Sequence, residues 1–181
     1  MLVFVSGDSA SGKSALAERV CAALAPGAKH IYIATMPVRS DEDRRKVARH
    51  HALRAGRGFE TYEMPNRLGP VPPDAAVLLE CLSTFTANRM FSGEAPTVAG
   101  GWLETLWAEL QPLLDRPGPT VIVSADVAAD GVAFSAETED YRRVLTGLGI
   151  RLCERADCAV EAVCGRAVVR KGTLEESGDR S

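Results

Sequence analysis

Residues 7–14 read GDSASGKS, the feature of the sequence that most constrains its fold. It fits the pattern G-x-x-x-x-G-K-S and lies between a short apolar run at residues 2–6 and an alanine-rich, helix-favouring segment at residues 14–24. The two glycines allow the backbone to turn tightly, so that its N–H groups and a helix amino terminus point into one concavity. A strand, a glycine-rich loop and a helix in this order predict a site for the polyphosphate of a nucleotide.

The octapeptide also predicts which side chains act on that nucleotide. Lys13 is expected to reach the β- and γ-phosphates, and the Ser14 hydroxyl to bind Mg²⁺. Magnesium takes its other ligands from phosphate oxygens, water and an acidic residue at the end of a neighbouring strand. Glu80 and Asp126 follow predicted strands and are the two candidates. The predicted nucleotide-binding residues are Gly7, Asp8, Ser9, Ala10, Ser11, Gly12, Lys13 and Ser14.

Strand-like and helix-like segments alternate along the chain. Apolar, β-branched runs predict strands at residues 2–6, 30–35, 77–82 and 120–124. Helices are predicted at residues 14–24, 41–53, 84–90, 100–114 and 137–155, and a closing hairpin at residues 159–163 and 167–170, with its turn at 164–166. This order predicts an α/β fold of the P-loop NTPase kind, with helices on both faces of a mostly parallel sheet.

The composition of the chain argues against several classes of protein. With 181 residues and 46% hydrophobic residues, one domain is expected over residues 1–172, with a flexible polar tail at residues 173–181. A net charge of -3 provides no basic field for nucleic acid, and no apolar run approaches the roughly 20 residues of a membrane span. Five cysteines without CxxC or zinc-ligand spacing suggest reduced thiols. A cytoplasmic protein without a nucleic-acid partner is therefore expected.

Two adjacent histidines, His50 and His51, lie in the basic segment DRRKVARHHALR. On the predicted helix His50 shares a face with Arg54, and His51 is rotated by about 100° from it. A neutral imidazole can attack a nucleotide α-phosphorus and form a phosphoramidate, with Arg54 and Arg49 stabilising the developing charge. Such a pair in a basic helix is more often part of a solvated face, so the residues alone leave both interpretations open.

Four segments considered together are more specific than any one of them. They are the GDSASGKS loop with its strand, HIYIAT at residues 30–35, K-V-x-x-H-x-x-x-R at residues 46–54, and LLECLSTFTANRMF at residues 78–91. In order and spacing they resemble the adenosylcobinamide kinase / adenosylcobinamide-phosphate guanylyltransferase family, and a weaker match continues to about residue 171. The resemblance implies a bifunctional enzyme of cobalamin biosynthesis. It would phosphorylate adenosylcobinamide with a nucleoside triphosphate, then transfer GMP from GTP through a guanylylated histidine to give adenosylcobinamide-GDP.

The resemblance also implies roles for particular residues. The family pattern R-I-x-x-H falls on residues 46–50, which makes His50 the implied nucleophile and His51 the second choice. The family's acidic strand end falls on Glu80, the preferred carboxylate for the metal, and Asn88 matches the asparagine that follows. Members of the family form trimers with the site near a subunit boundary, so a homo-oligomer is implied.

The sequence departs from the family pattern in both halves. The family loop G-G-x-R-S-G-K-S has Asp8 and Ala10 here, which add a negative charge and remove a positive one beside the phosphates. The later signature S-N-E-V-G-x-G-I-V-P is changed to SADVAADGVA, with Ala125 and Asp126 replacing asparagine and glutamate, and Ile150 replaces a further asparagine. The early changes bear on nucleotide affinity or choice, and the later ones on corrinoid contacts or one of the two activities.

Two alternatives therefore stand beside the bifunctional enzyme. One is a small-molecule kinase on the same fold, without guanylyl transfer. The other is a degenerate nucleotide-binding regulator. The departures from the family pattern are the reason to consider it. The sequence leaves ATP and GTP open as phosphoryl donor.

Overall fold

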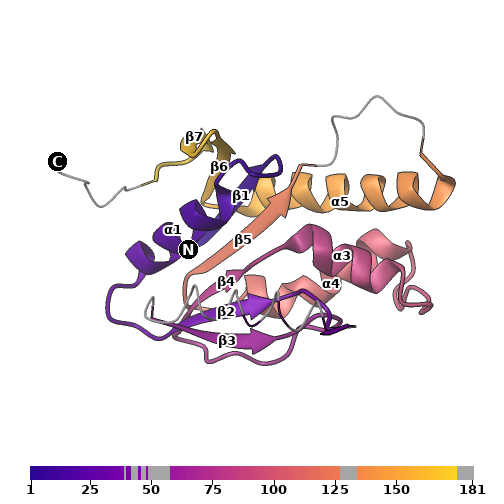
Figure 1. Ribbon diagram of the computed structural model, residues 1–181, viewed down its shortest axis with the longest axis horizontal. Coiled ribbons are helices and arrows are strands. Elements are labelled where there is room, and N and C mark those ends of the chain that lie inside the picture. Colours follow the sequence, from indigo (N-terminus) through magenta and orange to yellow (C-terminus); the bar gives the residue numbers. More distant parts are fainter. Residues whose placement is uncertain (39, 42–44, 46–47, 49–57, 127–133, 175–181) are drawn as a thin grey trace.

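A seven-stranded sheet runs through the molecule in the order β3-β2-β4-β5-β1-β6-β7 (Figure 1). The structure, a computed structural model, describes residues 1–38, 40–41, 45, 48, 58–126 and 134–174. All neighbouring strands are parallel except β6 and β7, which form an antiparallel hairpin. The strands are β1 (Leu2–Gly7), β2 (His30–Ala34), β3 (Phe59–Glu63), β4 (Ala76–Leu79), β5 (Thr120–Ala125), β6 (Cys158–Val163) and β7 (Arg166–Lys171).

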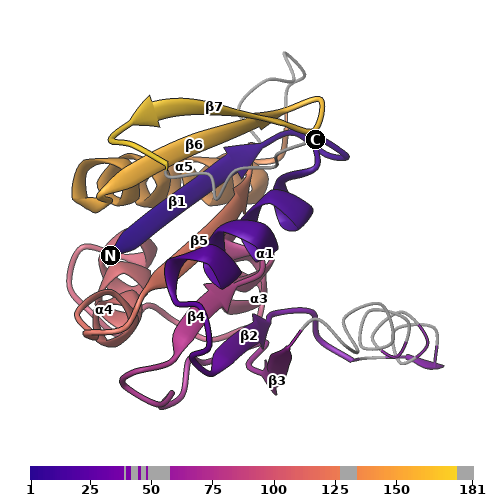
Figure 2. The same cartoon turned by 90° about the vertical axis from the view of Figure 1, so that its left-hand side faces the viewer.

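Helices cover the sheet on both faces (Figure 2). Helix α1 (Lys13–Leu24) packs on one face, while α3 (Leu82–Met90), α4 (Trp102–Leu114) and α5 (Ala136–Arg155) pack on the other. The alternation of side chains along β1 explains this division, because Val3 and Val5 join the core beneath α1 and Phe4 joins the core on the opposite face. The α/β fold class predicted from the sequence is confirmed.

The predicted strands and helices that fall on described residues are all present, with ends shifted by a few residues. The hairpin turn is formed by Cys164 and Gly165, whose φ angles of 49° and 78° suit a two-residue turn. Strand β3 was not predicted, because its sequence FETYE is polar and half-exposed at the edge of the sheet. Of the helix expected at residues 41–53, the structure describes Asp41, Arg45 and Ala48, which are helical and exposed. The predicted tail at residues 173–181 lies mostly outside the described residues.

A buried arginine stabilises the carboxyl-terminal part of α3. Arg89 is fully buried, and its guanidinium donates to the two carboxylate oxygens of Glu109 at 2.7 and 3.1 Å. A third hydrogen bond, of 2.7 Å, reaches Glu94 in the connection to α4, and it holds the pKa of that carboxyl below its usual range. The guanidinium also lies 5.7 Å from the centre of the Trp102 ring. These contacts fix α3 against α4.

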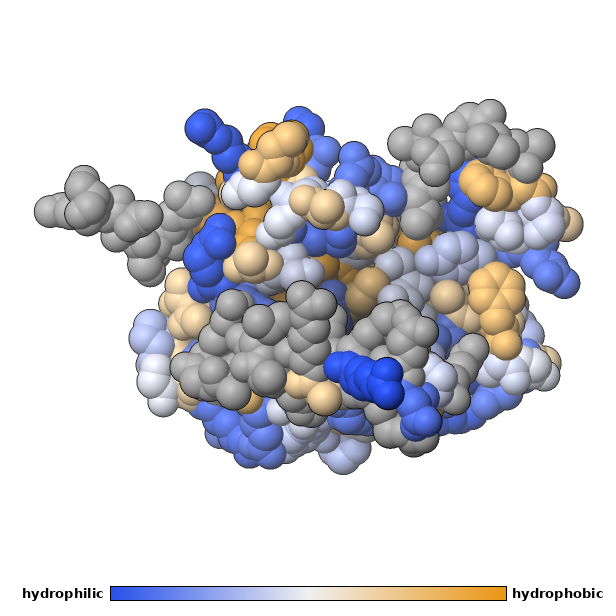
Figure 3. Space-filling model, in the orientation of Figure 1, coloured by the Kyte–Doolittle hydropathy of each residue, from blue (hydrophilic) through white to orange (hydrophobic). Residues whose placement is uncertain are grey.

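The surface of the molecule is mixed in character. On the side seen in Figure 3, hydrophobic residues are scattered among hydrophilic ones, as is usual for exposed surfaces. Among the helices described, none combines the length and the apolar character that a bilayer crossing demands.

Candidate nucleotide site

The phosphate loop begins where β1 ends and leads directly into α1. Gly7 has a φ of +154° and is buried, and a Cβ atom there would lie 2.7 Å from the Ala162 carbonyl oxygen. Gly12 precedes the first helical residue with a φ of +88°, in the left-handed region that favours glycine. Both predicted glycines are therefore required by the backbone itself. The loop they form leaves the amino terminus of α1 open to solvent, since Gly12 and Ser14 are exposed.

The hairpin between β6 and β7 is in direct backbone contact with this loop. The Gly165 N–H donates to the Ser11 carbonyl oxygen at 2.8 Å. A Cβ atom on Gly12 would lie 3.0 Å from the Gly165 Cα atom, so the two backbones are in close contact. This contact was not predicted from the sequence, because about 150 residues separate the loop from the hairpin and only the strand order brings them together.

Side chains of the loop differ in what they offer to a phosphate. Asp8 and Ala10 are exposed, and Ala10 has a φ of 58°. Ser11 is buried, and its Oγ atom has no hydrogen-bond partner among the described residues. The Lys13 ammonium donates to the Asp8 carbonyl oxygen at 2.9 Å, an exposed hydrogen bond to the loop's own backbone. A phosphate oxygen could replace that carbonyl as the partner of Lys13 at little cost, because a charge-assisted bond to phosphate is stronger.

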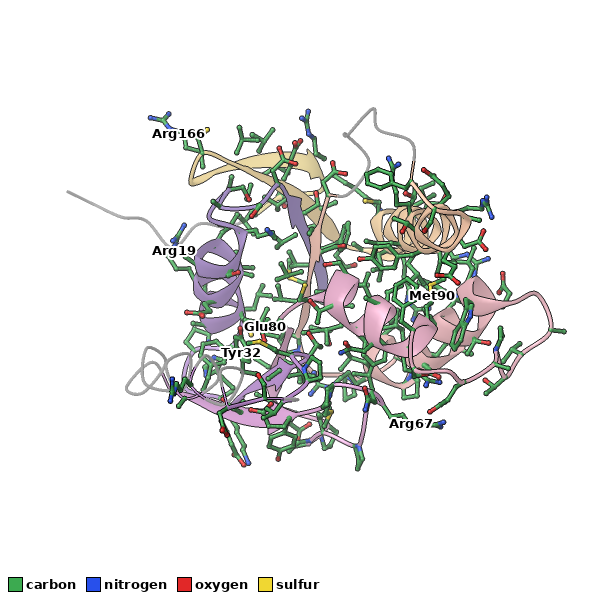
Figure 4. The ribbon with its side chains drawn as sticks, turned by 45° about the vertical axis from the view of Figure 1, so that its right-hand side comes forward. Arg19, Tyr32, Arg67, Glu80, Met90 and Arg166 are labelled. Carbon is green, nitrogen blue, oxygen red and sulfur yellow. The ribbon has the colours of Figure 1, made fainter. Side chains whose placement is uncertain are left out.

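The two predicted acidic candidates lie at the same edge of the sheet as the loop. Asp126 follows β5, the neighbour of β1, and its N–H donates to the Gly7 carbonyl oxygen at 3.1 Å. Glu80 follows β4, one strand further away, and its N–H donates to the Ile33 carbonyl oxygen at 3.1 Å. Glu80 is half-buried and lies between α1 and α3 (Figure 4). Asp126 is exposed. The structure therefore brings both carboxylates to the edge where nucleotides bind in open α/β sheets.

Cys81 begins α3 immediately after Glu80. Its Sγ atom lies 3.0 Å from the Ser83 Oγ atom, and it accepts hydrogen bonds from the Thr84 hydroxyl at 3.1 Å and the Thr84 N–H at 3.5 Å. The thiol therefore acts as a helix cap and fixes the backbone next to Glu80. A second cysteine, Cys21, is buried between α1 and the sheet, and burial raises the pKa of its thiol to about 12, so it is protonated at neutral pH.

The remaining predicted catalytic residues cannot be placed. His50, Arg54, His51 and Arg49 lie outside the described residues. Among the residues that are described, no group of three or more His, Cys, Asp or Glu side chains could hold a metal ion. A magnesium ion bound with a nucleotide needs only one or two carboxylates, because phosphate and water supply the other ligands.

One cavity of the described part of the chain lies away from this site. It has a volume of about 660 Å³ and is formed between the end of α3 and the first turns of α4 and α5. Its lining includes the apolar Phe91, Trp102 and Leu103 and the charged Asp140 and Arg143, but none of the eight loop residues. The nucleotide site is assigned from the chemistry of the loop and not from cavity size.

Solved structures similar to this one share its fold. One of them, an ATPase domain, is 10% identical in sequence, with a TM-score of 0.51, and the match covers 94% of this chain and 76% of that one. A prototypical ATPase from the type III secretion system of pathogenic bacteria is 15% identical, with a TM-score of 0.50 and coverage of 93% and 56%. At these identities the likeness concerns the fold alone, and it confirms the P-loop NTPase kind of sheet.

Sequence comparisons are more specific. The bifunctional adenosylcobalamin biosynthesis protein CobU of Salmonella typhimurium strain LT2 is 32% identical over 170 residues, which cover 87% of this chain and 92% of that protein. The protein of the same name from Escherichia coli strain K12 is 26% identical, with the same coverage. The family model for cobinamide kinase / cobinamide phosphate guanyltransferase matches residues 3–169. The chain therefore belongs to the cobinamide kinase / cobinamide phosphate guanyltransferase family.

Proposed function

We propose that this chain phosphorylates adenosylcobinamide with ATP or GTP, and then transfers GMP from GTP through His50 to give adenosylcobinamide-GDP. Membership of the family supports the two activities in cobalamin biosynthesis. The observation that carries the proposal is the GDSASGKS loop, which presents Lys13 and the open amino terminus of α1 at the carboxyl edge of the sheet. A homo-oligomer, trimeric by family resemblance, is part of the proposal.

In the first reaction the corrinoid hydroxyl oxygen attacks the γ-phosphorus and loses its proton to water, and a nucleoside diphosphate leaves. The loop N–H groups hold the β- and γ-phosphates, while Lys13 moves from the Asp8 carbonyl to phosphate oxygens and stabilises the charge that develops on them. A hydroxyl at Ser14 and carboxylates at Glu80 and Asp126 are hard oxygen donors that suit Mg²⁺, which would supply further charge neutralisation when bound.

In the second reaction an imidazole nitrogen of His50 attacks the α-phosphorus of GTP, and pyrophosphate leaves. A phosphate oxygen of the phosphorylated corrinoid then attacks the phosphoramidate and releases the histidine. Arg54 is proposed to stabilise the developing charge at the α-phosphate.

Incubation of the protein with GTP and Mg²⁺ tests the proposal through intact mass spectrometry. We expect one added GMP, labile to acid as a phosphoramidate is, on the peptide that contains His50. A folded protein that binds GTP without forming an adduct would contradict guanylyl transfer. Phosphorylation of adenosylcobinamide by that same protein would then identify the plain kinase, and the absence of any turnover would identify the nucleotide-binding regulator.

The metal carboxylate can be assigned by comparing Glu80→Gln with Asp126→Asn. Family resemblance and the rigid backbone around Glu80 favour that residue, so Glu80→Gln should raise the Mg²⁺ concentration for half-maximal kinase activity by more than roughly tenfold. Asp126→Asn should change it by less than about threefold, since its exposed side chain leaves water free to replace the lost ligand. The opposite order in a Mg²⁺ titration would assign Asp126 instead.

A further inference from the structure

A hollow lined by hydrophobic side chains lies between the end of α3 and the first turns of α4 and α5. It is the cavity of about 660 Å³, a volume typical of sites for small organic molecules. Phe91 and Trp102 contribute aromatic rings to its wall, and Leu103 and Val144 contribute aliphatic side chains. Met90, at the end of α3, lies next to α5 (Figure 4), and Phe91 is 53% exposed. Partly exposed hydrophobic side chains gathered around one hollow are typical of a binding surface.

The cavity lies on the same side of the sheet as the phosphate loop. Helix α5 ends three residues before β6 begins, so it runs back from the carboxyl edge of the sheet to the amino edge. Its 20 residues span about 30 Å, whereas the six residues of β6 span about 20 Å. The first turns of α5 therefore extend beyond the carboxyl ends of the strands (Figure 1). In open α/β sheets that side is where ligands bind.

Tyr141 connects the cavity with the acidic strand end. Its hydroxyl donates to the Ser83 carbonyl oxygen at 3.1 Å, and Ser83 lies three residues after Glu80. The centre of the Tyr141 ring lies 6.0 Å from the centre of the Phe91 ring in the cavity wall. One tyrosine side chain thus reaches from the wall of the cavity to the first turn of α3, so the cavity is a neighbour of the strand end that carries Glu80.

The charged side chains at the cavity favour a cation. Glu137 and Asp140 supply two carboxylates, whereas Arg143 supplies one guanidinium, which is paired with Asp140 at 2.6 Å. A triphosphate would be repelled by this excess of negative charge. A cation that carries carboxamide groups would be attracted, and its amide N–H groups would donate hydrogen bonds to the carboxylates.

We propose that this cavity binds the corrin ring of adenosylcobinamide, with the side chain that carries the acceptor hydroxyl extending past Tyr141 toward Glu80 and the bound triphosphate. The corrin ring is a broad, methyl-substituted surface that suits a wall of aromatic and aliphatic side chains. Its peripheral carboxamides suit the charged rim, and the cobalt(III) complex is a cation because it carries no phosphate. The inference rests on the proposed function, since it places the substrate of the proposed kinase reaction.

Phe91→Ala tests the aromatic wall. The Kd of adenosylcobinamide, measured by equilibrium dialysis, should rise by roughly tenfold, because the ligand would bury the exposed half of this ring. Phe91→Tyr keeps the ring and should remain within about threefold of the parent. In kinase assays of Phe91→Ala the KM for adenosylcobinamide should rise with the Kd, while kcat and the Kd for ATP stay within about threefold.

Val144→Ala tests the wall formed by α5. It should raise the Kd of adenosylcobinamide by about threefold, since it removes less apolar surface than the loss of an aromatic ring. This variant also keeps the inference testable if Phe91→Ala does not fold.

Phe134→Ala is the matched control. Phe134 is an aromatic residue just before α5 and is 40% exposed, but its ring packs on the Arg142 guanidinium at 5.0 Å. It does not belong to the described side chains that line the cavity. The Kd of adenosylcobinamide in this variant should remain within about twofold of the parent.

An unchanged Kd of adenosylcobinamide in the folded Phe91→Ala and Val144→Ala variants would overturn the inference, as would equal weakening in Phe134→Ala. Failure of both cavity variants to fold would assign these side chains to the core and overturn it as well. If Phe91→Ala lowers the mass of the particle in analytical ultracentrifugation and leaves the Kd unchanged, the face contacts a second copy of the chain instead. A parent protein that does not bind adenosylcobinamide would overturn the proposed function itself.

Discussion

Lys13→Ala should remove most of the thermal stabilisation that ATP or GTP gives to this protein, while the protein without nucleotide melts at an unchanged temperature. Lys13 is half-buried, and the one hydrogen bond described for its ammonium group is exposed and reaches the loop's own Asp8 carbonyl. The fold therefore loses little with the side chain, but a bound triphosphate loses its main cationic partner among the described residues of the loop.

The expected size of the effect follows from mass action. At a nucleotide concentration of 100 Kd, binding stabilises the parent by about 2.7 kcal/mol, or roughly 5–10 °C in Tm for a chain of this size. If the substitution weakens binding by about 100-fold, the same concentration stabilises the variant by about 0.4 kcal/mol, or roughly 1 °C. Differential scanning fluorimetry with and without nucleotide measures both values.

Lys29→Ala provides the control for this experiment. Lys29 is also a lysine beside a strand, but it precedes β2 at the opposite edge of the sheet and forms an exposed ion pair of 2.6 Å with Glu60. It should retain the full nucleotide-dependent shift, since exposed pairs contribute little to stability. Equal stabilisation of Lys13→Ala and the parent would show that GDSASGKS is not the phosphate site.

The local sequence was sufficient to predict the backbone geometry of the loop and the positions of the two strand-end carboxylates, while the roles of these residues remain predictions. The two glycines of the loop, Lys13 and the strand-end carboxylates were all predicted, because their spacing and flanking elements express the backbone geometry directly. The positive φ of Gly12 and the close approach of Gly7 to Ala162 give the physical reason for that pattern.

The features that were missed depend on contacts between distant segments. Strand β3 lacks an apolar alternation because it lies at an edge, and its pairing with β2 provides the stabilisation that its composition does not. The contact of Gly165 with Ser11 and the two hydrogen bonds of Asn88 join residues far apart in the chain. The family pattern includes Asn88, but only the folded structure shows that its side-chain amide donates hydrogen bonds to the carbonyl oxygens of Thr35 and Pro65.

Three of the residues that depart from the family pattern lie on the surface of the molecule. Asp8 and Ala10 occupy exposed positions of the loop, where a side chain can change the charge around the phosphates without disturbing the core. Ile150 is 56% exposed on α5, so the loss of an asparagine there also leaves the packing intact. These substitutions are tolerated by the fold, and their effects are therefore expected in binding and turnover and not in stability.

The second large effect is expected for His50→Ala, which should eliminate the GMP adduct and the guanylyltransferase activity while the kinase activity remains. The reason is chemical: alanine offers no nitrogen to attack the α-phosphorus, whereas phosphorylation of the corrinoid needs Lys13 and the loop but no covalent histidine. Loss of a nucleophile that forms the covalent intermediate should lower the rate of GMP transfer by at least about 1000-fold.

His51→Ala is the matched comparison, because it removes a neighbouring imidazole from the same basic segment and changes the overall charge in the same way. Adduct formation in this variant should remain within about tenfold of the parent, and the labelled peptide should still carry the GMP on His50.

An adduct that persists in His50→Ala and disappears in His51→Ala would assign the nucleophile to His51 and leave the two-step chemistry in place. An adduct that persists in both variants would exclude this histidine pair, and the covalent step would then have to be sought elsewhere in the chain. Kinase activity that falls together with the adduct in His50→Ala would show that the two reactions share more of the site than the phosphate loop, because the loop itself is unchanged in that variant.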